Sequence, residues 1–201
     1  MLLSRAMPRE ETLRCFVAVP VEEPGVCQSL AALRREAPAG ALKWVAPRQL
    51  HFTLKFLAEL PAALAAPAIA ALPEAARGVV PFRLTLAGLG TFPRSGPARV
   101  LWIGCREGRE ALEELARRVE AAFVAAGITP EERPFTAHLT LARAKDPRAG
   151  REATALARGR AGLEAGAIDV HELVLFRSVL GSAGAEHTPM ARARLGGATP
   201  A

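Results

Sequence analysis

A tetrapeptide with histidine first and threonine third occurs twice in this chain, as His51-Phe52-Thr53-Leu54 and as His138-Leu139-Thr140-Leu141. Successive side chains on a β-strand point to opposite faces of the sheet. In each copy the histidine and the threonine would therefore share one face, and the two apolar residues would share the other. The pattern predicts two half-buried strands, each with an apolar core face and an open face that carries an imidazole and a hydroxyl.

The recurrence of the motif is what makes it informative. Threonine favours strands, and a single histidine beside a threonine is more often solvated or structural than catalytic. The chain has four histidines, however, and two of them open a copy of the same motif. Two ordinary amphipathic strands remain the alternative interpretation. If the two strands face each other, two imidazoles and two hydroxyls surround one small site.

The paired motif resembles the signature of the 2H phosphoesterases. Several surrounding segments are similar to the bacterial and archaeal RNA 2′,3′-cyclic phosphodiesterases, also called 2′-5′ RNA ligases: LRCFVAVP, KWVAPRQLHFTLKFLAEL, PFRLTLAGLGTFP, ARVLWIGC, EERPFTAHLTLAR and ELVLFRSVLG. The resemblance runs from about Leu13 to about Leu195. It implies a bilobal fold with the active-site cleft between the lobes.

The expected order of elements indicates an internal repeat of supersecondary structure. Apolar periodicity and helix-breaking residues predict strands at 13–19, 43–45, 82–86, 99–103, 168–180 and 189–195 in addition to the two motif strands, and helices from about 24, 61 or 67, 107 and 147. Each motif strand has a helix before it and a helix after it. The predicted fold class is therefore α+β, with two pseudo-symmetric lobes, each an antiparallel sheet backed by helices.

No linker or low-complexity segment separates the two halves, so we expect residues 13–201 to form one bilobal domain. Residues 1–12 are expected to be a poorly ordered extension without the apolar segment of a signal peptide. No apolar run approaches the roughly 20 residues of a membrane span. The three cysteines are scattered, which suggests reduced thiols. We expect a cytoplasmic monomer that does not contact membranes.

The charge of the chain favours an anionic partner. The formal net charge is +6 and the isoelectric point is about 10.2, and nucleic acid is a natural partner for such a protein. Arginine far outnumbers lysine and alanine is abundant, so a GC-rich coding bias is an alternative source of part of this charge.

Two histidines across a small site can catalyse displacement at phosphorus. The imidazole pKa lies near neutral pH, so one ring can accept the proton of the attacking oxygen while the other protonates the leaving oxygen. A threonine hydroxyl beside each ring can donate to the phosphate oxygens as their charge increases. The sequence contains no G-x-x-x-x-G-K-[ST] loop, which gives no support to ATP binding of that kind.

The resemblance adds the substrate and the roles. It implies that water opens the 2′,3′-cyclic phosphate at an RNA end and leaves a 2′-phosphate, without a metal or another cofactor. It assigns His51 as the proton donor and His138 as the proton acceptor, with Thr53 and Thr140 beside them. The residues themselves do not distinguish the two roles, which reverse if the reaction runs toward ligation.

Three further residues are candidates for substrate binding, and each has a structural alternative. Arg143 has a counterpart in the family and is a candidate to hold phosphate or an RNA backbone oxygen, although on an ideal strand it would point away from Thr140. Phe16 and Trp44 are candidates to stack on a base, and burial in the core is the alternative for both. Lys55 either shares the face of His51 or is solvated.

The other two histidines and the rival functions stay open. His171 is expected to be structural or exposed, and the sequence does not tell whether His187 touches the substrate. The rival functions are 2′-5′ ligation of RNA ends, hydrolysis of a small cyclic nucleotide, and binding of RNA without catalysis. A metallohydrolase is not supported, because no H-x-x-x-H pattern or nearby acidic ligand accompanies the motifs.

Overall fold

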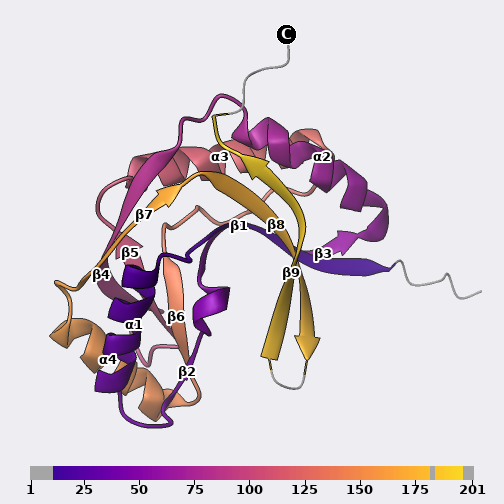
Figure 1. The fold of residues 1–201 in the computed structure, drawn as a ribbon. Coiled ribbons are helices and arrows are strands. Elements are labelled where there is room, and N and C mark those ends of the chain that lie inside the picture. Colours follow the sequence, from indigo (N-terminus) through magenta and orange to yellow (C-terminus); the bar gives the residue numbers. More distant parts are fainter. Residues whose placement is uncertain (1–10, 182–183, 197–201) are drawn as a thin grey trace, which may run out of the picture.

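The computed structural model describes residues 11–181 and 184–196 (Figure 1). Within these residues the strands are β1 (Thr12–Pro20), β2 (Leu42–Trp44), β3 (His51–Pro61), β4 (Phe82–Phe92), β5 (Val100–Cys105), β6 (Leu139–Ala144), β7 (Glu164–Val170), β8 (Glu172–Gly181) and β9 (Gly184–Arg194). The α-helices are α1 (Pro24–Glu36), α2 (Ala65–Ala76), α3 (Arg109–Ala125) and α4 (Pro147–Gly159), and two 3-10 turns, η1 (Pro47–Gln49) and η2 (Ala62–Leu64), flank β3.

The nine strands form one antiparallel sheet in the order β7-β4-β5-β6-β3-β1-β8-β9, and β2 also pairs with β6. The pairing between β3 and β6 is the shortest in the sheet and consists of the single residue pair Phe52 and Leu139. We call β3, β1, β8 and β9 the β1 half of the sheet, and β7, β4, β5, β6 and β2 the β4 half. Two separate sheets were expected from the sequence, whereas the structure joins them into one.

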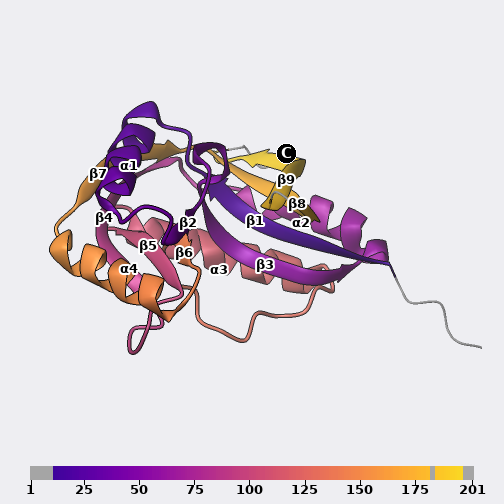
Figure 2. The ribbon, with the colours of Figure 1, turned by 90° about the horizontal axis from the view of Figure 1, so that it is seen from below.

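Each half of the sheet is covered by two helices. Helix α2 packs on β8 and β9 and α3 packs on β3, while α1 packs on β7 and α4 packs on β4, β5 and β6. In Figure 1, α2 and α3 lie above the β1 half and α1 and α4 lie at the lower left. Viewed from below, β1 and β3 run side by side in front of α3 (Figure 2).

Two of the four helices do not cover the half from which the chain enters them. Helix α1 follows β1 but packs on β7 of the β4 half, and α3 follows β5 but packs on β3 of the β1 half. The chain also returns to the β1 half at its end, because β8 and β9 pair beside β1. The two halves are therefore interleaved along the sequence, although each motif strand lies between two helices as predicted.

The apolar positions of both motifs lie in the core. Phe52 and Leu139 are completely buried, and Leu54 and Leu141 are 7% and 2% exposed. They belong to one hydrophobic cluster that spans both halves of the sheet and all four helices. The alternation predicted for the two motif strands is confirmed at these residues.

The single strand predicted at 168–180 is wrong. The structure divides this stretch at His171 into β7, which pairs with β4, and β8, which pairs with β1. An apolar run does not show where a strand crosses from one half of a sheet to the other, so the sequence pattern could not reveal the break. Of the expected extension at residues 1–12, residues 1–10 lie outside the described residues and Thr12 opens β1.

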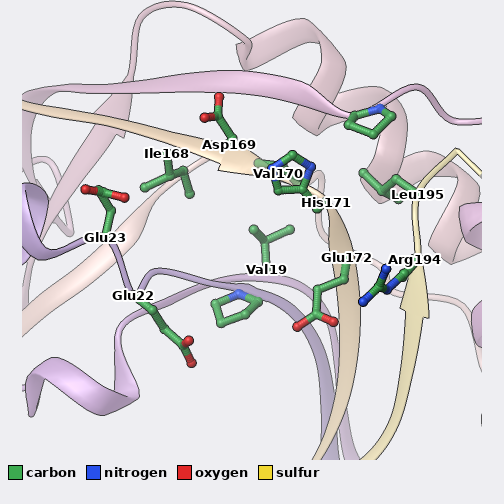
Figure 3. A pocket seen from close by; sticks show the side chains of 12 residues that line it. Val19, Glu22, Glu23, Ile168, Asp169, Val170, His171, Glu172, Arg194 and Leu195 are labelled. Atoms are coloured by element: carbon green, nitrogen blue, oxygen red, sulfur yellow. The ribbon is translucent and has the colours of Figure 1, made fainter.

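A cavity of about 750 Å³ lies beside the break at His171. Figure 3 shows its lining, with Glu22 and Glu23 on one side and Glu172 and Arg194 on the other. None of the motif residues lines it. His171 borders this cavity and is exposed, which agrees with the second of the two expectations for it, a structural or an exposed residue.

Candidate active site

The pairing of Phe52 with Leu139 brings the two motifs together. Because these two residues point into the core, the residues on either side of them point to the opposite face of the sheet. That face carries His51, Thr53, His138 and Thr140, which are all half-buried. Continued antiparallel register sets His51 opposite Thr140 and Thr53 opposite His138. We call this surface the motif face.

The two imidazoles are held in the same way. His51 Nδ1 lies 2.7 Å from the carbonyl oxygen of Gln49, and His138 Nδ1 lies 2.8 Å from that of Thr136, in each case two residues back along the chain. A carbonyl oxygen only accepts hydrogen bonds, so Nδ1 carries the proton in both rings. In the neutral rings Nε2 is then the basic nitrogen, which is free to exchange a proton with a substrate.

Two rings contact the imidazole of His51. The ring of Phe16 stacks on it with 4.7 Å between centroids, and the ring of His187 meets it edge-on at 5.5 Å. Burial lowers the pKa of His51 to about 4 against the opposing hydrogen bond to Gln49, and the charges of His187 and His138 lower it further. His51 is therefore neutral at pH 7 while the motif face carries no anion.

The surroundings of His138 are aromatic in a different way. Phe92 meets its ring edge-on at 5.1 Å, and Trp102 lies at 6.3 Å from it. Trp102 pairs with Thr140 across the sheet and with Gly90 on its other side. Neither Phe92 nor Trp102 is a site residue predicted from the sequence. The sequence signal that could have indicated them is their position on strands with alternating apolar and polar residues, in a chain with only 5% aromatic residues.

A bulge turns Arg143 onto the motif face. On β5, Val100 pairs with Arg143 and Trp102 pairs with Thr140, and Val100 and Trp102 share a face because they are two residues apart. Arg143 and Thr140 therefore share that face although they are three residues apart, because the register shifts at Leu141. An ideal strand would have pointed Arg143 away. Lys43, which pairs with Arg143, adds a second exposed cation on the same face.

A bulge at the matching place in β3 turns Lys55 away from the motif face. Thr53 pairs with Ala18 and Lys55 pairs with Val17, which are consecutive and therefore point to opposite faces. Lys55 is only 3% exposed, and its Nζ donates to Glu120 at 2.6 Å and to the carbonyl oxygen of Thr129 at 3.1 Å. Both expectations for Lys55, a shared face with His51 and a solvated side chain, are wrong.

Phe16 and Trp44 lie on different faces of the sheet: Trp44 packs against the core, as the structural alternative had it, whereas Phe16 is buried on the motif face against His51. Phe16 is 3% exposed, and its faces contact His51 and Phe176, at 4.7 and 5.2 Å between centroids. Trp44 pairs with Ala142 and packs partly buried against the core, on the face opposite Arg143. Phe16 supports His51, and its stacked contacts with His51 and Phe176 leave it no open face for a base.

His187 lies beside His51 and lines a cavity of about 360 Å³ with it. Burial lowers the pKa of His187. The polar lining of this cavity comes from Glu22, Arg48, Gln49, His51, Glu186, His187, Thr188 and Arg192. Gln49 Nε2 donates to the carbonyl oxygen of Ala185 at 2.6 Å and so ties η1 to β9. The lining of the cavity therefore comes from the end of β1, from η1 and the start of β3, and from β8 and β9.

Two negative findings apply to the described part of the chain. Within residues 11–181 and 184–196, three or more His, Cys, Asp or Glu side chains nowhere gather as a metal site would require. In the same residues no helix is long and apolar enough to span a membrane.

The fold and the site together define a class: an α+β protein whose sheet presents two histidine–threonine pairs to one face, as suits acid–base chemistry at phosphorus. The chain belongs to the 2′-5′ RNA ligase superfamily, whose family model matches residues 22–181. This membership confirms the resemblance to the 2H phosphoesterases.

Relatives and solved structures agree with this membership. The chain is 37% identical over 158 residues, 77% of this chain and 82% of its relative, to a protein of Aquifex aeolicus named RNA 2′,3′-cyclic phosphodiesterase. It is 32% identical over 91% of its length to a protein of the same name from Methanothermobacter thermautotrophicus, of which it covers 99%. The crystal structure of TT0787 of Thermus thermophilus matches with a TM-score of 0.75 and 30% identity over 91% of this chain and 98% of that chain. Escherichia coli LigT in apo form matches with a TM-score of 0.71 and 28% identity over 92% and 98%.

Proposed function

We propose that this protein hydrolyses the 2′,3′-cyclic phosphate at RNA ends to a 2′-phosphate, by acid–base catalysis with His51 and His138 and without a metal. The observation that carries the proposal is the matched pair of imidazoles on the motif face. Each has Nδ1 bound to a carbonyl oxygen and each stands beside a threonine. The names of the relatives support the choice of substrate.

In the proposed reaction, water attacks the phosphorus and His138 Nε2 accepts its proton. The bond between phosphorus and the 3′ oxygen breaks, and His51 Nε2 gives its proton to that oxygen. The 2′-phosphate remains, His138 is left charged and His51 neutral, and exchange with solvent restores both. Thr53 and Thr140 donate hydrogen bonds to the phosphate oxygens, where negative charge increases in the transition state.

The proposed role of His51 requires that the substrate charges it. Its pKa of about 4 leaves it neutral in the empty site. A cyclic phosphodiester carries one negative charge, and an opposite charge within a few ångströms favours the protonated imidazole. Binding of the anion therefore prepares the acid, and the cations Arg143 and Lys43 on the same face help to hold that anion.

We place the terminal nucleoside in the cavity of about 360 Å³ beside His51. The terminal nucleoside carries the cyclic phosphate on its own ribose. Its base must therefore lie close to the two imidazoles, no farther from them than the length of one nucleoside. The cavity borders His51 directly and offers carboxylates, guanidinium groups and an amide for the edges of a base.

The proposal is tested with an RNA oligonucleotide that ends in a 2′,3′-cyclic phosphate, in EDTA and without added nucleotide. The expected product is a 2′-phosphate end with the wild type, and none at a comparable rate with His51→Ala or His138→Ala. His171→Ala, outside the motif face, is the matched control and should behave as wild type. Activity that appears only with a divalent metal would contradict the mechanism, and binding without turnover would favour the RNA-binding alternative.

If a 5′-hydroxyl end takes the place of water, the same site would join the two RNA ends in a 2′-5′ linkage. His138 would then accept the proton of the 5′-hydroxyl and His51 would protonate the leaving 3′ oxygen, so the roles stay as in hydrolysis and the reversal expected from the sequence is wrong. Adding an RNA with a 5′-hydroxyl end to the same assay measures this ligation directly. A joined product formed faster than the 2′-phosphate end would make ligation the main activity.

A further inference from the structure

The two motif strands carry bulges at the same place. In β3 the register shifts between the pairs of Thr53 and Lys55, and in β6 it shifts between those of Thr140 and Ala142. The third residue after each motif threonine is consequently turned onto the motif face. In β6 that residue is Arg143, and in β3 it is Phe56, which pairs with Phe16.

Phe56 is an exposed aromatic residue at a position where a strand could carry a polar one. It is 39% exposed, whereas its partner Phe16 is 3% exposed. The guanidinium carbon of Arg14 lies 4.5 Å from the centroid of the Phe56 ring. An arginine over an exposed phenylalanine is a cation–π pair, and Arg14 is itself exposed.

This pair is continuous with the candidate active site. Phe56 is the cross-strand neighbour of Phe16, and Phe16 stacks on His51. Neither Phe56 nor Arg14 borders the cavity that we assign to the terminal nucleoside. Phe56 therefore lies on the same open face as His51, on the far side of Phe16.

We propose that Phe56 and Arg14 form a stacking platform for the base of the nucleotide on the 5′ side of the cyclic phosphate. An aromatic ring stacks on any base, and a guanidinium group adds a planar cation for a base or a phosphate. The positive net charge of the chain suits a polyanionic strand. The inference rests on the proposed function, and it makes the preferred substrate an RNA end of two or more nucleotides.

The test measures kcat/KM for an oligonucleotide and for a single nucleoside, both with 2′,3′-cyclic phosphates, and takes the ratio of the two as the preference for the longer substrate. Phe56→Ala should lower this ratio by roughly 5- to 100-fold, which is the loss expected when one base loses an aromatic partner. The loss should appear in KM of the oligonucleotide, because stacking away from the phosphate binds ground state and transition state equally. Phe56→Trp should keep the ratio, and Arg14→Gln should lower it.

Ile69→Ala is the matched control, because Ile69 is also 39% exposed but lies on α2, which packs on the core face. This variant should keep the wild-type ratio. An unchanged ratio in Phe56→Ala would overturn the platform, and so would an equal loss on both substrates. If the wild type opens neither cyclic phosphate, the proposed function itself fails, which is distinguishable from both of these results.

Discussion

The ring of Phe16 lies flat against the imidazole of His51, with 4.7 Å between the centroids and 24° between the planes. The contact excludes water from one face of the catalytic candidate and helps to explain why its pKa falls to about 4. The sequence suggested Phe16 as a residue that stacks on a base, but in the structure it stacks on the His51 imidazole.

The first prediction concerns pH. His51 binds a proton less readily in the folded protein than in the unfolded chain, where its pKa is near 6.5. Between these values the unfolded chain binds more protons, so the free energy of unfolding should fall as the pH drops from about 6.5 to about 4. The contribution of His51 is fully present above this window and amounts to roughly 3 kcal/mol at most.

Urea unfolding at several pH values measures this effect. His51→Gln should flatten the dependence, and NMR titration of the His51 ring should give a midpoint near 4 that rises when inorganic phosphate is added. His187 has a lowered pKa as well, so the comparison is repeated in His187→Phe. A midpoint near 6.5 in the phosphate-free protein would contradict the burial argument.

The second prediction concerns the two motif histidines. His51→Ala and His138→Ala should each lower kcat on a cyclic phosphate by roughly 10²- to 10⁴-fold, the usual contribution of general acid–base catalysis. The double variant should lose much less than the product of the two single losses, because the two rings act in one step. Single-turnover rates of all three variants check this. Fully multiplicative losses would show that the rings act independently.

The third prediction concerns Gly90, which lies under the indole of Trp102. A Cβ atom on Gly90 would approach Trp102 Cζ2 to 2.2 Å, so Gly90→Ala must displace a ring that flanks His138. We expect a loss of roughly 1–3 kcal/mol in stability, as for other overpacked sites, together with a lower kcat. Thermal unfolding and turnover are measured on the same preparation.

Gly159→Ala is the control for Gly90. Gly159 is the last residue of α4, and nothing lies within 4 Å of the place where its Cβ would be. This substitution should leave turnover unchanged and stabilise slightly, by up to about 1 kcal/mol. If Gly90→Ala and Gly159→Ala had the same thermal stability and the same kcat, the packing of Trp102 would not matter for the site.

The fourth prediction concerns Lys55, whose side chain is 1% exposed in its ion pair with Glu120. Lys55→Ala leaves a cavity where the Lys55 side chain was and a Glu120 carboxylate, 33% exposed, without its partner, and should cost roughly 2–3 kcal/mol. Lys55→Met, which fills the same space, should cost less. Arg77→Ala breaks an exposed ion pair with Glu74 and should cost about 0–1 kcal/mol. Urea unfolding separates these cases, and equal costs for Lys55→Ala and Arg77→Ala would place Lys55 in solvent.

The sequence predicted the motif strands and their faces because apolar and polar residues alternate with a period of two residues along a half-buried strand. Phe52 and Leu139 are completely buried in the core, whereas their histidine and threonine neighbours are only half-buried on the opposite face, as that period requires. The same period failed for Lys55 and Arg143, because a bulge adds one residue and exchanges the faces beyond it. No residue type marks a bulge reliably enough for the sequence to show it.

Other parts of the site depend on long-range pairing. Phe92, Trp102 and His187 reach the motif histidines only because β4, β5 and β9 take particular places in the sheet order. Periodicity reports which face a side chain occupies, but not which strand lies next to it. The break at His171 was missed for the same reason, since the two strands that it separates are both apolar.

The exchange of helices between the halves has a consequence for how the protein can come apart. A cut after α2 would leave one fragment with α1 but without β7, on which α1 packs, and the other fragment with α3 but without β3. Neither fragment could bury its own apolar surface. The sequence repeat therefore does not correspond to two detachable modules, and the spacing between the two imidazoles is kept as long as the whole chain stays folded.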